Sequence, residues 1–181
     1  MRKAFILLML SFVVFAACET QPTKNPTLQS FENKDALVAA AKEVIKEITV
    51  EDFKTMYDGE DYFVLIDVRT IKEYDTGYIP GAACIPRGVL EFQIGKEDVW
   101  DEMGLYIPEK TDPIVLNCRT GNRSALAAKS LMELGYQNVL SLQGGWKAFH
   151  EAYPELIEKI IVDDVSYDNH TSAAETAAGG C

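Results

Sequence analysis

A cysteine placed between a predicted strand and a predicted helix is the strongest sign of chemistry in this sequence. Cys118 directly follows the apolar run at residues 113–117, and an apolar helical stripe begins after Ser124. Unpaired backbone amides and the positive end of the helix dipole meet at such a junction. Both favour a negatively charged group there, and thiolates are stabilised in this way in many reactive-cysteine proteins. The sequence therefore predicts that Cys118 is a nucleophile.

The loop after this cysteine has the composition of an anion site. Residues 118–124 read CRTGNRS. Gly121 allows a positive φ, which turns backbone amides inward toward an anion. Arg119 and Arg123 are candidates to hold an anionic substrate. Two alternatives remain open: Arg119 could be a solvated loop charge, and Arg123 could pair with a carboxylate such as Asp67.

The other three cysteines, Cys18, Cys84 and Cys181, are too dispersed for a disulfide scaffold. Cys84 lies in an apolar run, where we expect it to pack as a small hydrophobic side chain. No Cys/His spacing matches a metal site, so the sequence predicts neither a metal nor a cofactor. The simplest alternative for Cys118 itself is a buried structural thiol, which the flanking arginines and the glycine argue against.

Composition limits the domain count and the partners. A chain of 181 residues with 48% hydrophobic residues is long enough for one globular domain plus tails. Its formal net charge is −11. Nucleic-acid binding depends on clustered lysine and arginine residues, so we expect no nucleic-acid partner.

Apolar runs and helical stripes alternate along the chain. We predict strands at 62–68, 82–85, 113–117 and 139–142, and helices at 51–57, 70–74, 124–134 and 146–153. An earlier helix starts at Asn33 or Asp35, and its 3- and 4-residue apolar spacing continues to Ile48. Together they predict an α/β domain with a mainly parallel central sheet flanked by helices on both faces. Ligands of such sheets bind beyond the carboxyl ends of the strands, where Cys118 is placed.

Two further segments have structural expectations. Asp67 and Arg69 stand at the end of a predicted strand, where we expect them to fix loops and the sheet edge rather than to act as catalytic acid and base. The stretch at 87–108 is expected to form extra helices or a lid.

Beyond the cysteine loop, several motifs resemble the single-domain rhodaneses, the thiosulfate sulfurtransferases. The loop CRTGNRS is similar to the active-site loop of that family. Residues 65–69 (LIDVR), Tyr74, residues 77–82 (GYIPGA) and residues 142–146 (LQGGW) are similar to further family motifs in order and spacing. Tyr78 stands where histidine is usual, and Trp146 follows the glycine pair directly.

The resemblance implies a function and roles for the loop. Cys118 would take the outer sulfur of thiosulfate as a persulfide and pass it to cyanide or a thiol. The substrate-binding residues would be the rest of the loop: Arg119, Thr120, Gly121, Asn122, Arg123 and Ser124. One alternative is a sulfur-binding or redox-sensing module without turnover. A cysteine phosphatase or arsenate reductase is less favoured, because Cys118 to Arg123 is Cys-x4-Arg and those enzymes have Cys-x5-Arg.

The first residues are typical of an exported chain. Arg2 and Lys3 precede a short apolar run, and residues 15–18 (FAAC) resemble a bacterial lipobox with Cys18 as the lipidated residue. We therefore expect a signal peptide at 1–17, a linker at 18–32, the rhodanese-like domain at 33–162 and a flexible tail at 163–181. Signal removal changes the net charge from −11 to −13 because two positive charges are lost. The expected protein is a monomeric bacterial lipoprotein, held in the periplasm or on the cell envelope by its lipid alone.

The tail carries one further hypothesis. Its last residues, Gly179, Gly180 and Cys181, resemble the Gly-Gly-Cys arm of sulfur-carrier proteins. Cys181 could accept sulfur from Cys118 or resolve it as a disulfide, and the alternative is a tail without a role.

Overall fold

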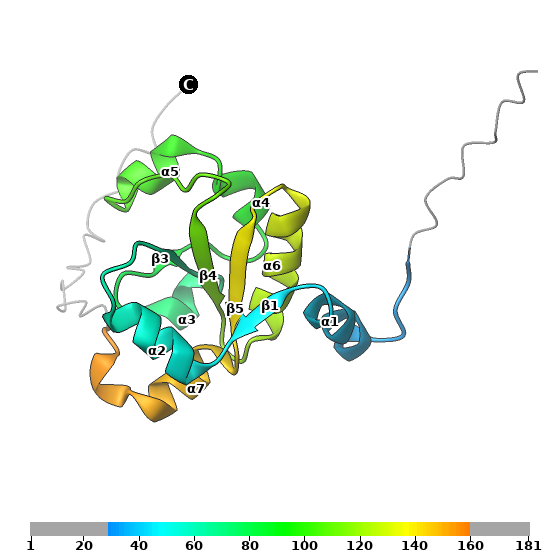
Figure 1. Ribbon diagram of the computed structural model, residues 1–181, viewed down its shortest axis with the longest axis horizontal. Coiled ribbons are helices and arrows are strands. Elements are labelled where there is room, and N and C mark those ends of the chain that lie inside the picture. Colours follow the sequence, from blue (N-terminus) through cyan, green and yellow to red (C-terminus); the bar gives the residue numbers. More distant parts are fainter. Residues whose placement is uncertain (1–28, 160–181) are drawn as a thin grey trace, which may run out of the picture. The chain divides into compact units, whose positions relative to one another are not determined.

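The computed structural model describes residues 29–159 (Figure 1). The chain divides into two units, 1–30 and 31–181, and every helix and strand given below belongs to the second. The expectations for the signal peptide, Cys18, Cys181 and the tail at 163–181 concern residues outside the described range. Within residues 29–159, no helix has the length and hydropathy needed to cross a membrane.

Five strands form the central sheet. They are β1 (Lys46–Ile48), β2 (Val64–Asp67), β3 (Ala83–Cys84), β4 (Pro113–Asn117) and β5 (Asn138–Leu142). Their order is β1-β5-β4-β2-β3, and every pairing is parallel. Because all strands run the same way, Asp67 at the end of β2 is paired with Asn117 at the end of β4. The residues that follow these two strands therefore emerge at the same edge of the sheet.

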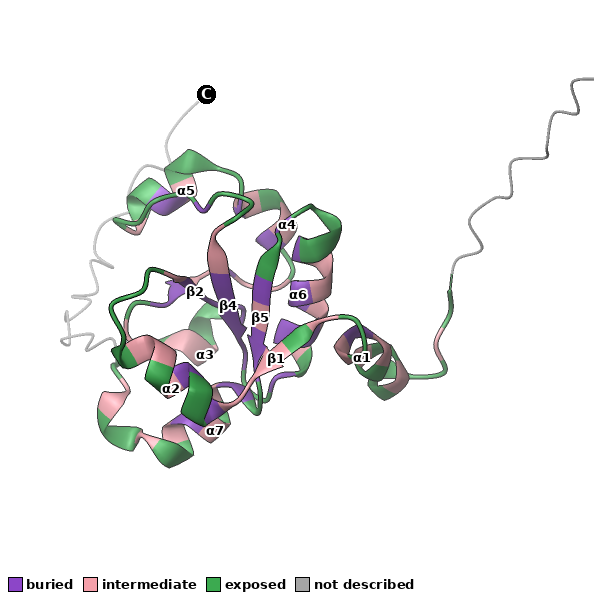
Figure 2. Cartoon of the chain, viewed as in Figure 1, coloured by how far each residue is buried: buried purple, intermediate pink, exposed green. Residues whose placement is uncertain are grey.

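Helices cover both faces of the sheet, which confirms the predicted fold class. The helices are α1 (Lys34–Lys42), α2 (Val50–Asp58), α3 (Ile71–Asp75), α4 (Leu90–Gln93), α5 (Glu97–Glu102), α6 (Asn122–Glu133) and α7 (Gly145–Ala152), with a short 3-10 helix at Pro154–Leu156. On one face α6 packs against β4, β5, α1 and α4, and on the other α7 packs against α2 and β5. The inner strands β2 and β4 are the most buried elements (Figure 2).

Alternating side chains of the strands supply two apolar cores. Ile66 and Ile114 face the core beneath α6, whereas Leu65 and Val115 face the core beneath α2 and α7. A strand buried on both faces explains why the sequence shows continuous apolar runs rather than an alternating pattern.

The predicted helix at 33–48 is wrong in its second half. Asn33 caps α1 as expected, because its side chain accepts hydrogen bonds from the amides of residues 35 and 36. The helix ends at Lys42, and β1 follows, adding to the edge of β5 with Ile48 opposite Leu142. The 3- and 4-residue spacing of apolar residues does not distinguish a helix from a short strand here. The parallel edge of β5 favours the strand.

The expected structural role of Asp67 and Arg69 is confirmed. Both side chains are buried, with 0% and 2% exposure. The Arg69 Nε donates to Asp67 Oδ2 at 2.8 Å, and its Nη atoms donate to the backbone carbonyls of Glu73 and Gly77 at 3.1 and 2.8 Å. A buried ion pair with its remaining protons satisfied is held firmly in place. The end of β2 is thus tied to α3 and to the turn that follows it.

The segment at 87–108 forms the extra helices that were expected. These are α4 and α5, and Leu90, Ile94 and Trp100 place them on the core beneath α6. The Trp100 indole is fully buried and donates to the carbonyl of Ile94 at 2.9 Å.

Candidate active site

The predicted nucleophile lies at the carboxyl end of the central strand β4. Cys118 is only 1% exposed, and its side chain belongs to the core on the α6 face. The helix α6 begins at Asn122, two residues before the expected start at Ser124. Its N-cap is Gly121, whose φ of +87° lies in the left-handed region that glycine adopts without strain. The structure thus confirms the strand–cysteine–turn–helix arrangement that the sequence predicted.

The cysteine loop is held from one side by the N-terminus of α7. The amide of Trp146 donates to the Cys118 carbonyl at 2.7 Å, and the amide of Lys147 donates to the Arg119 carbonyl at 3.0 Å. Gly145 makes this approach sterically allowed, because a Cβ on it would lie 2.2 Å from the Cys118 carbonyl oxygen. The glycine pair at 144–145 is therefore part of the site, a role that residue types and spacing alone did not reveal.

These contacts leave loop amides available on the other side. In a planar trans peptide the carbonyl and the following N–H point in opposite directions. With the carbonyls of Cys118 and Arg119 directed at α7, the amides of Arg119 and Thr120 point away from it. Within residues 29–159, the amides of residues 119–121 donate to no backbone or side-chain acceptor. The first-turn amides of α6, from Asn122 to Ser124, have no helical partner either.

Arg123 at the start of α6 is paired with a carboxylate on α3. Its Nη1 and Nη2 donate to the two carboxylate oxygens of Glu73 at 2.8 and 2.7 Å. A carboxylate partner for Arg123 was one of the open alternatives, and the partner is Glu73 rather than Asp67. The carboxylate of Asp67 is already engaged by Arg69.

Glu73 is fixed from two sides. It completes a capping box with Thr70 at the start of α3, in addition to the pair with Arg123. The hydrogen bonds from Arg123 hold the pKa of Glu73 at about 2, and the carboxylate in turn raises the pKa of Arg123. The ion pair therefore joins α3 to the first turn of α6 beside Cys118.

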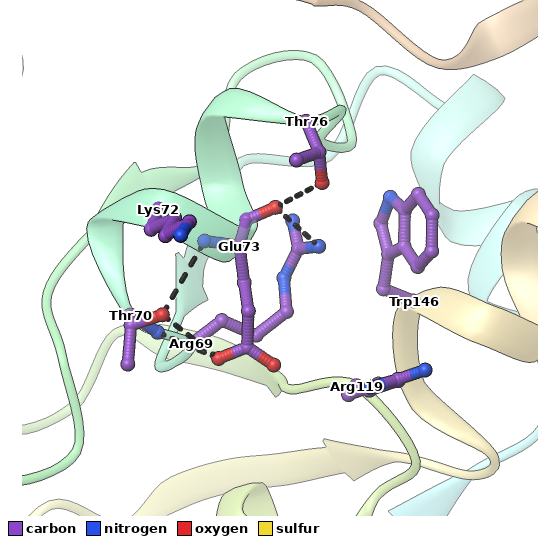
Figure 3. A pocket seen from close by; sticks show the side chains of 7 residues that line it. All are labelled: Arg69, Thr70, Lys72, Glu73, Thr76, Arg119 and Trp146. Atoms are coloured by element: carbon purple, nitrogen blue, oxygen red, sulfur yellow. Dashed lines mark hydrogen bonds between the residues drawn. The ribbon is translucent and has the colours of Figure 1, made fainter.

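A pocket of about 350 Å³ opens next to the loop (Figure 3). Its lining residues are Arg69, Thr70, Lys72, Glu73, Thr76, Arg119 and Trp146. Arg69 and Glu73 are neutralised by their partners, and the Arg69 guanidinium lies 4.8 Å from the centre of the Trp146 ring. Lys72 and Arg119 form no ion pair within the described residues. The pocket is thus locally cationic on an acidic chain.

Only part of the predicted site lines this pocket. Of the predicted loop residues, Arg119 lines it, whereas Cys118 is buried behind the loop. The sequence analysis did not identify Lys72 and Trp146 as pocket residues. In a sequence, a lysine on a helix is typical of the surface, and an aromatic residue after a glycine pair is typical of a core.

Cys84 lies outside the cysteine loop. It is half-buried at the end of β3, and burial together with the nearby Asp67 raises the pKa of its thiol to about 11. Cys84 is therefore a protonated, weakly nucleophilic thiol at neutral pH.

Fold and loop together define an α/β domain that carries a buried cysteine in a turn between a central strand and a helix. The chain belongs to the family of rhodanese-like domains, which matches residues 49–152. The family resemblance of the sequence motifs is thereby confirmed.

Relatives of known sequence or structure agree with this assignment. The thiosulfate sulfurtransferase GlpE of Pseudoalteromonas translucida is 31% identical over 115 residues, which cover 63% of this chain and 97% of the relative. The human single-domain sulfurtransferase TSTD1 is 25% identical with a TM-score of 0.54, covering 58% of this chain and 95% of its own. A protein of unknown function from Rhodopseudomonas palustris, described as a possible tyrosine phosphatase, is 29% identical with a TM-score of 0.56, covering 68% and 94%. The two relatives named as sulfurtransferases support sulfurtransferase chemistry in general, whereas the third supports the shared fold.

The ion pair between Glu73 and Arg123 predicts a pH-dependent stability. Glutamine at 73 keeps the capping hydrogen bond but loses the charge. Because the pair is about one-third exposed, we expect Glu73→Gln to lower the free energy of unfolding by about 1 kcal/mol at neutral pH. The contribution is fully present above pH 4.5, the ordinary pKa of the side chain, and is lost as the pH falls toward 2. Urea unfolding of both proteins across this range measures the difference.

The matched control is Glu73→Gln in an Arg123→Met background. There the difference between glutamate and glutamine should show little pH dependence, because the partner charge is absent. A difference in the native background that stays constant from neutral pH to pH 3 would contradict the assignment.

Proposed function

We propose that this protein is a sulfurtransferase that carries sulfur on Cys118. The thiolate attacks the outer sulfur of thiosulfate, the S–S bond of the donor breaks, and sulfite leaves with the bonding electron pair. A cyanide ion or a thiolate acceptor then attacks the terminal sulfur of the Cys118 persulfide, and the Cys118 thiolate is released. Each half-reaction is a displacement at sulfur and needs no oxidant or cofactor.

The arrangement of the cysteine loop carries this proposal. The carbonyls of the loop are bound by α7, so the amides of Arg119 and Thr120 and the first turn of α6 are free to bind negative charge. Preorganised backbone donors stabilise an anion without reorganisation when the charge develops. A thiolate, a persulfide and a departing sulfite are all anions that such a loop favours.

The geometry disfavours the phosphatase alternative, although one structural relative is described as a possible phosphatase. A phosphatase loop needs an arginine that turns toward the tetrahedral oxyanion. Here Arg123 donates both Nη atoms to Glu73, and the loop from Cys118 to Arg123 has four intervening residues. The loop therefore offers a smaller, less cationic cradle, which suits a sulfur atom better than a phosphate group.

The pocket beside the loop is the proposed approach route of the donor. Lys72 and Arg119, which form no ion pair within residues 29–159, place two positive charges on its wall together with the ring of Trp146. A chain with a net charge of −11 repels thiosulfate at a distance, but salt screens that repulsion beyond about 8–10 Å. Local cations at the pocket then determine how the anion binds.

The first test is the release of sulfite and thiocyanate from thiosulfate plus cyanide. We expect Cys118→Ser to abolish both products, because serine cannot hold a persulfide. The matched control is Cys84→Ser, which removes a raised-pKa thiol outside the loop and should keep most of the activity.

Undiminished product release by Cys118→Ser would refute the nucleophile. Hydrolysis of a phosphate ester without any sulfur transfer would favour the phosphatase alternative. A stable persulfide with no release to cyanide or thiols would favour the sulfur-binding module.

The second test concerns the cations of the pocket. We expect Lys72→Met and Arg119→Met each to lower kcat/KM for thiosulfate by about fivefold, the equivalent of about 1 kcal/mol for a screened charge. The effect should fall with added salt. Lys96→Met, which removes an exposed lysine between α4 and α5, is the control and should leave kcat/KM unchanged. Equal losses in all three variants would contradict a role for the pocket.

The proposal extends to the ends of the chain on sequence grounds alone. We propose an exported lipoprotein anchored through Cys18, with Cys181 as a second sulfur carrier. Labelled fatty acid should enter the wild type and not Cys18→Ser, and label in neither protein would contradict the anchor.

A further inference from the structure

Two buried serines lie next to the sulfur of Cys118. Ser124 in the first turn of α6 and Ser141 in β5 are both 0% exposed. The Ser141 Oγ donates to the Ser124 Oγ at 2.9 Å. The Ser124 Oγ in turn lies 3.6 Å from the Cys118 Sγ and 3.1 Å from the carbonyl oxygen of Gly121.

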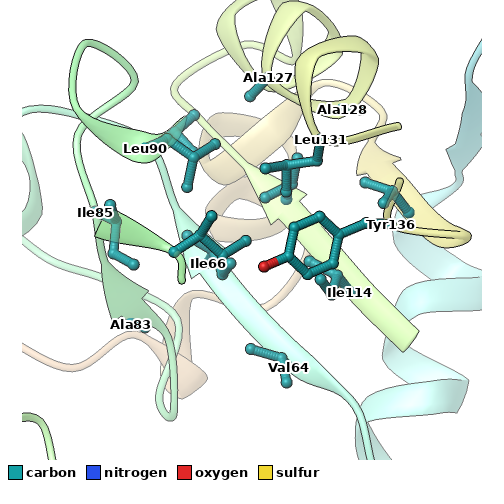
Figure 4. Packing of buried hydrophobic residues seen from close by; sticks show 14 of the residues in the cluster. Val64, Ile66, Ala83, Ile85, Leu90, Ile114, Ala127, Ala128, Leu131 and Tyr136 are labelled. Carbon is teal, nitrogen blue, oxygen red and sulfur yellow. The ribbon is translucent and has the colours of Figure 1, made fainter. Parts of the chain in front are cut away.

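The fold places these hydroxyls in an otherwise apolar layer. Ser124 shares the buried face of α6 with Ala127, Ala128 and Leu131, which pack over the sheet (Figure 4). Ser141 lies on the same face of β5 as Val139, which belongs to this core. Hydroxyl groups in such a layer are costly unless they are hydrogen-bonded. Their partners are each other, the Gly121 carbonyl and the sulfur of Cys118.

The two serine hydroxyls have two protons to donate. The proton of Ser141 is used on Ser124, so Ser124 has a single proton and two acceptors within reach, the Gly121 carbonyl and Cys118 Sγ. The carbonyl is the better acceptor when the sulfur is neutral. A thiolate is the better acceptor, because hydrogen bonds to charged groups are the stronger ones. The hydroxyl therefore turns to the sulfur when Cys118 loses its proton.

We propose that Ser124 is a catalytic hydrogen-bond donor to the Cys118 thiolate and that Ser141 is its positioning residue. The donation of Ser141 to Ser124 polarises the second hydroxyl and strengthens its bond to sulfur. No proton is transferred and no electrons move in this step. The proposal rests on the proposed function for the identity of the anion, since Cys118 must act as a thiolate.

The position of the hydroxyl serves both half-reactions. The Sγ atom is the nucleophile when thiosulfate is attacked and the leaving atom when the acceptor removes the outer sulfur. In the persulfide the negative charge lies on the outer sulfur, so Ser124 returns to the Gly121 carbonyl. One donor therefore stabilises the same atom at the start of the first step and at the end of the second.

The test is the pH dependence of Cys118 alkylation by iodoacetamide, followed by mass spectrometry of the Cys118 peptide from the full chain. We expect Ser124→Ala to move the midpoint of the rate profile upward by about one pH unit, because one hydrogen bond to the anion is lost. Ser141→Ala should move it upward by about half as much. Ser130→Ala, on the same helix but bonded to Arg87, should not move it.

The double variant separates a relay from two structural defects. Because Ser141 acts only through Ser124, the double variant should match Ser124→Ala, whereas independent effects would add. Additive shifts would refute the role of Ser141. An unchanged midpoint in Ser124→Ala would refute the whole proposal, even if sulfur transfer is normal. If Ser124→Ala does not fold, an unchanged midpoint in Ser141→Ala refutes it.

The failure of this proposal is distinguishable from that of the proposed function. Alkylation reports on the thiolate whether or not sulfur is transferred. Full sulfur transfer by Cys118→Ser would instead refute the proposed function and leave the alkylation result standing.

Discussion

The close approach of α7 to the cysteine loop is the constraint on which the site depends. Gly145 lies so near the loop that a single added Cβ would fall 2.2 Å from the Cys118 carbonyl oxygen. This contact lets the first amides of α7 bind the loop carbonyls and turns the next loop amides away from α7. The arrangement of backbone amides at the end of β4 is therefore a consequence of how two helices meet at one edge of a parallel sheet.

Pairing of charges around the loop determines which cations remain for substrate. Asp67 neutralises Arg69 in the buried layer, and Glu73 neutralises Arg123 at the surface. The first pair fixes α3 relative to the end of β2, and the second fixes α3 relative to the first turn of α6. Lys72 and Arg119 on the pocket wall have no ion-pair partner in the part of the chain that the structure describes. An acidic domain thus keeps a small cationic entrance without a basic surface.

The sequence predicted most of the fold and the centre of the site. The strand β4 agrees with its predicted bounds. The order of strand, Cys118 and helix was predicted correctly because an apolar run and an apolar helical stripe are both local in sequence. The strand β1 was missed because three residues at a sheet edge have little pattern of their own, and their pairing with β5 is a long-range effect. The sequence offered Asp67 as an example of a carboxylate partner for Arg123, whereas the structure pairs Arg123 with Glu73. Spacing cannot report which of several carboxylates the fold brings near. The hydrogen bond between Ser141 and Ser124 was not predicted either, because it joins a helix to a strand 17 residues away in sequence.

The central claim is that Cys118 carries the sulfur. The most direct test treats the full chain with one equivalent of thiosulfate and then measures the mass of its Cys118 peptide. The account predicts that the Cys118 peptide gains the mass of one sulfur atom as sulfite is released, and that cyanide removes it. Release of sulfite in equal amount while the Cys118 peptide keeps its original mass would contradict the account.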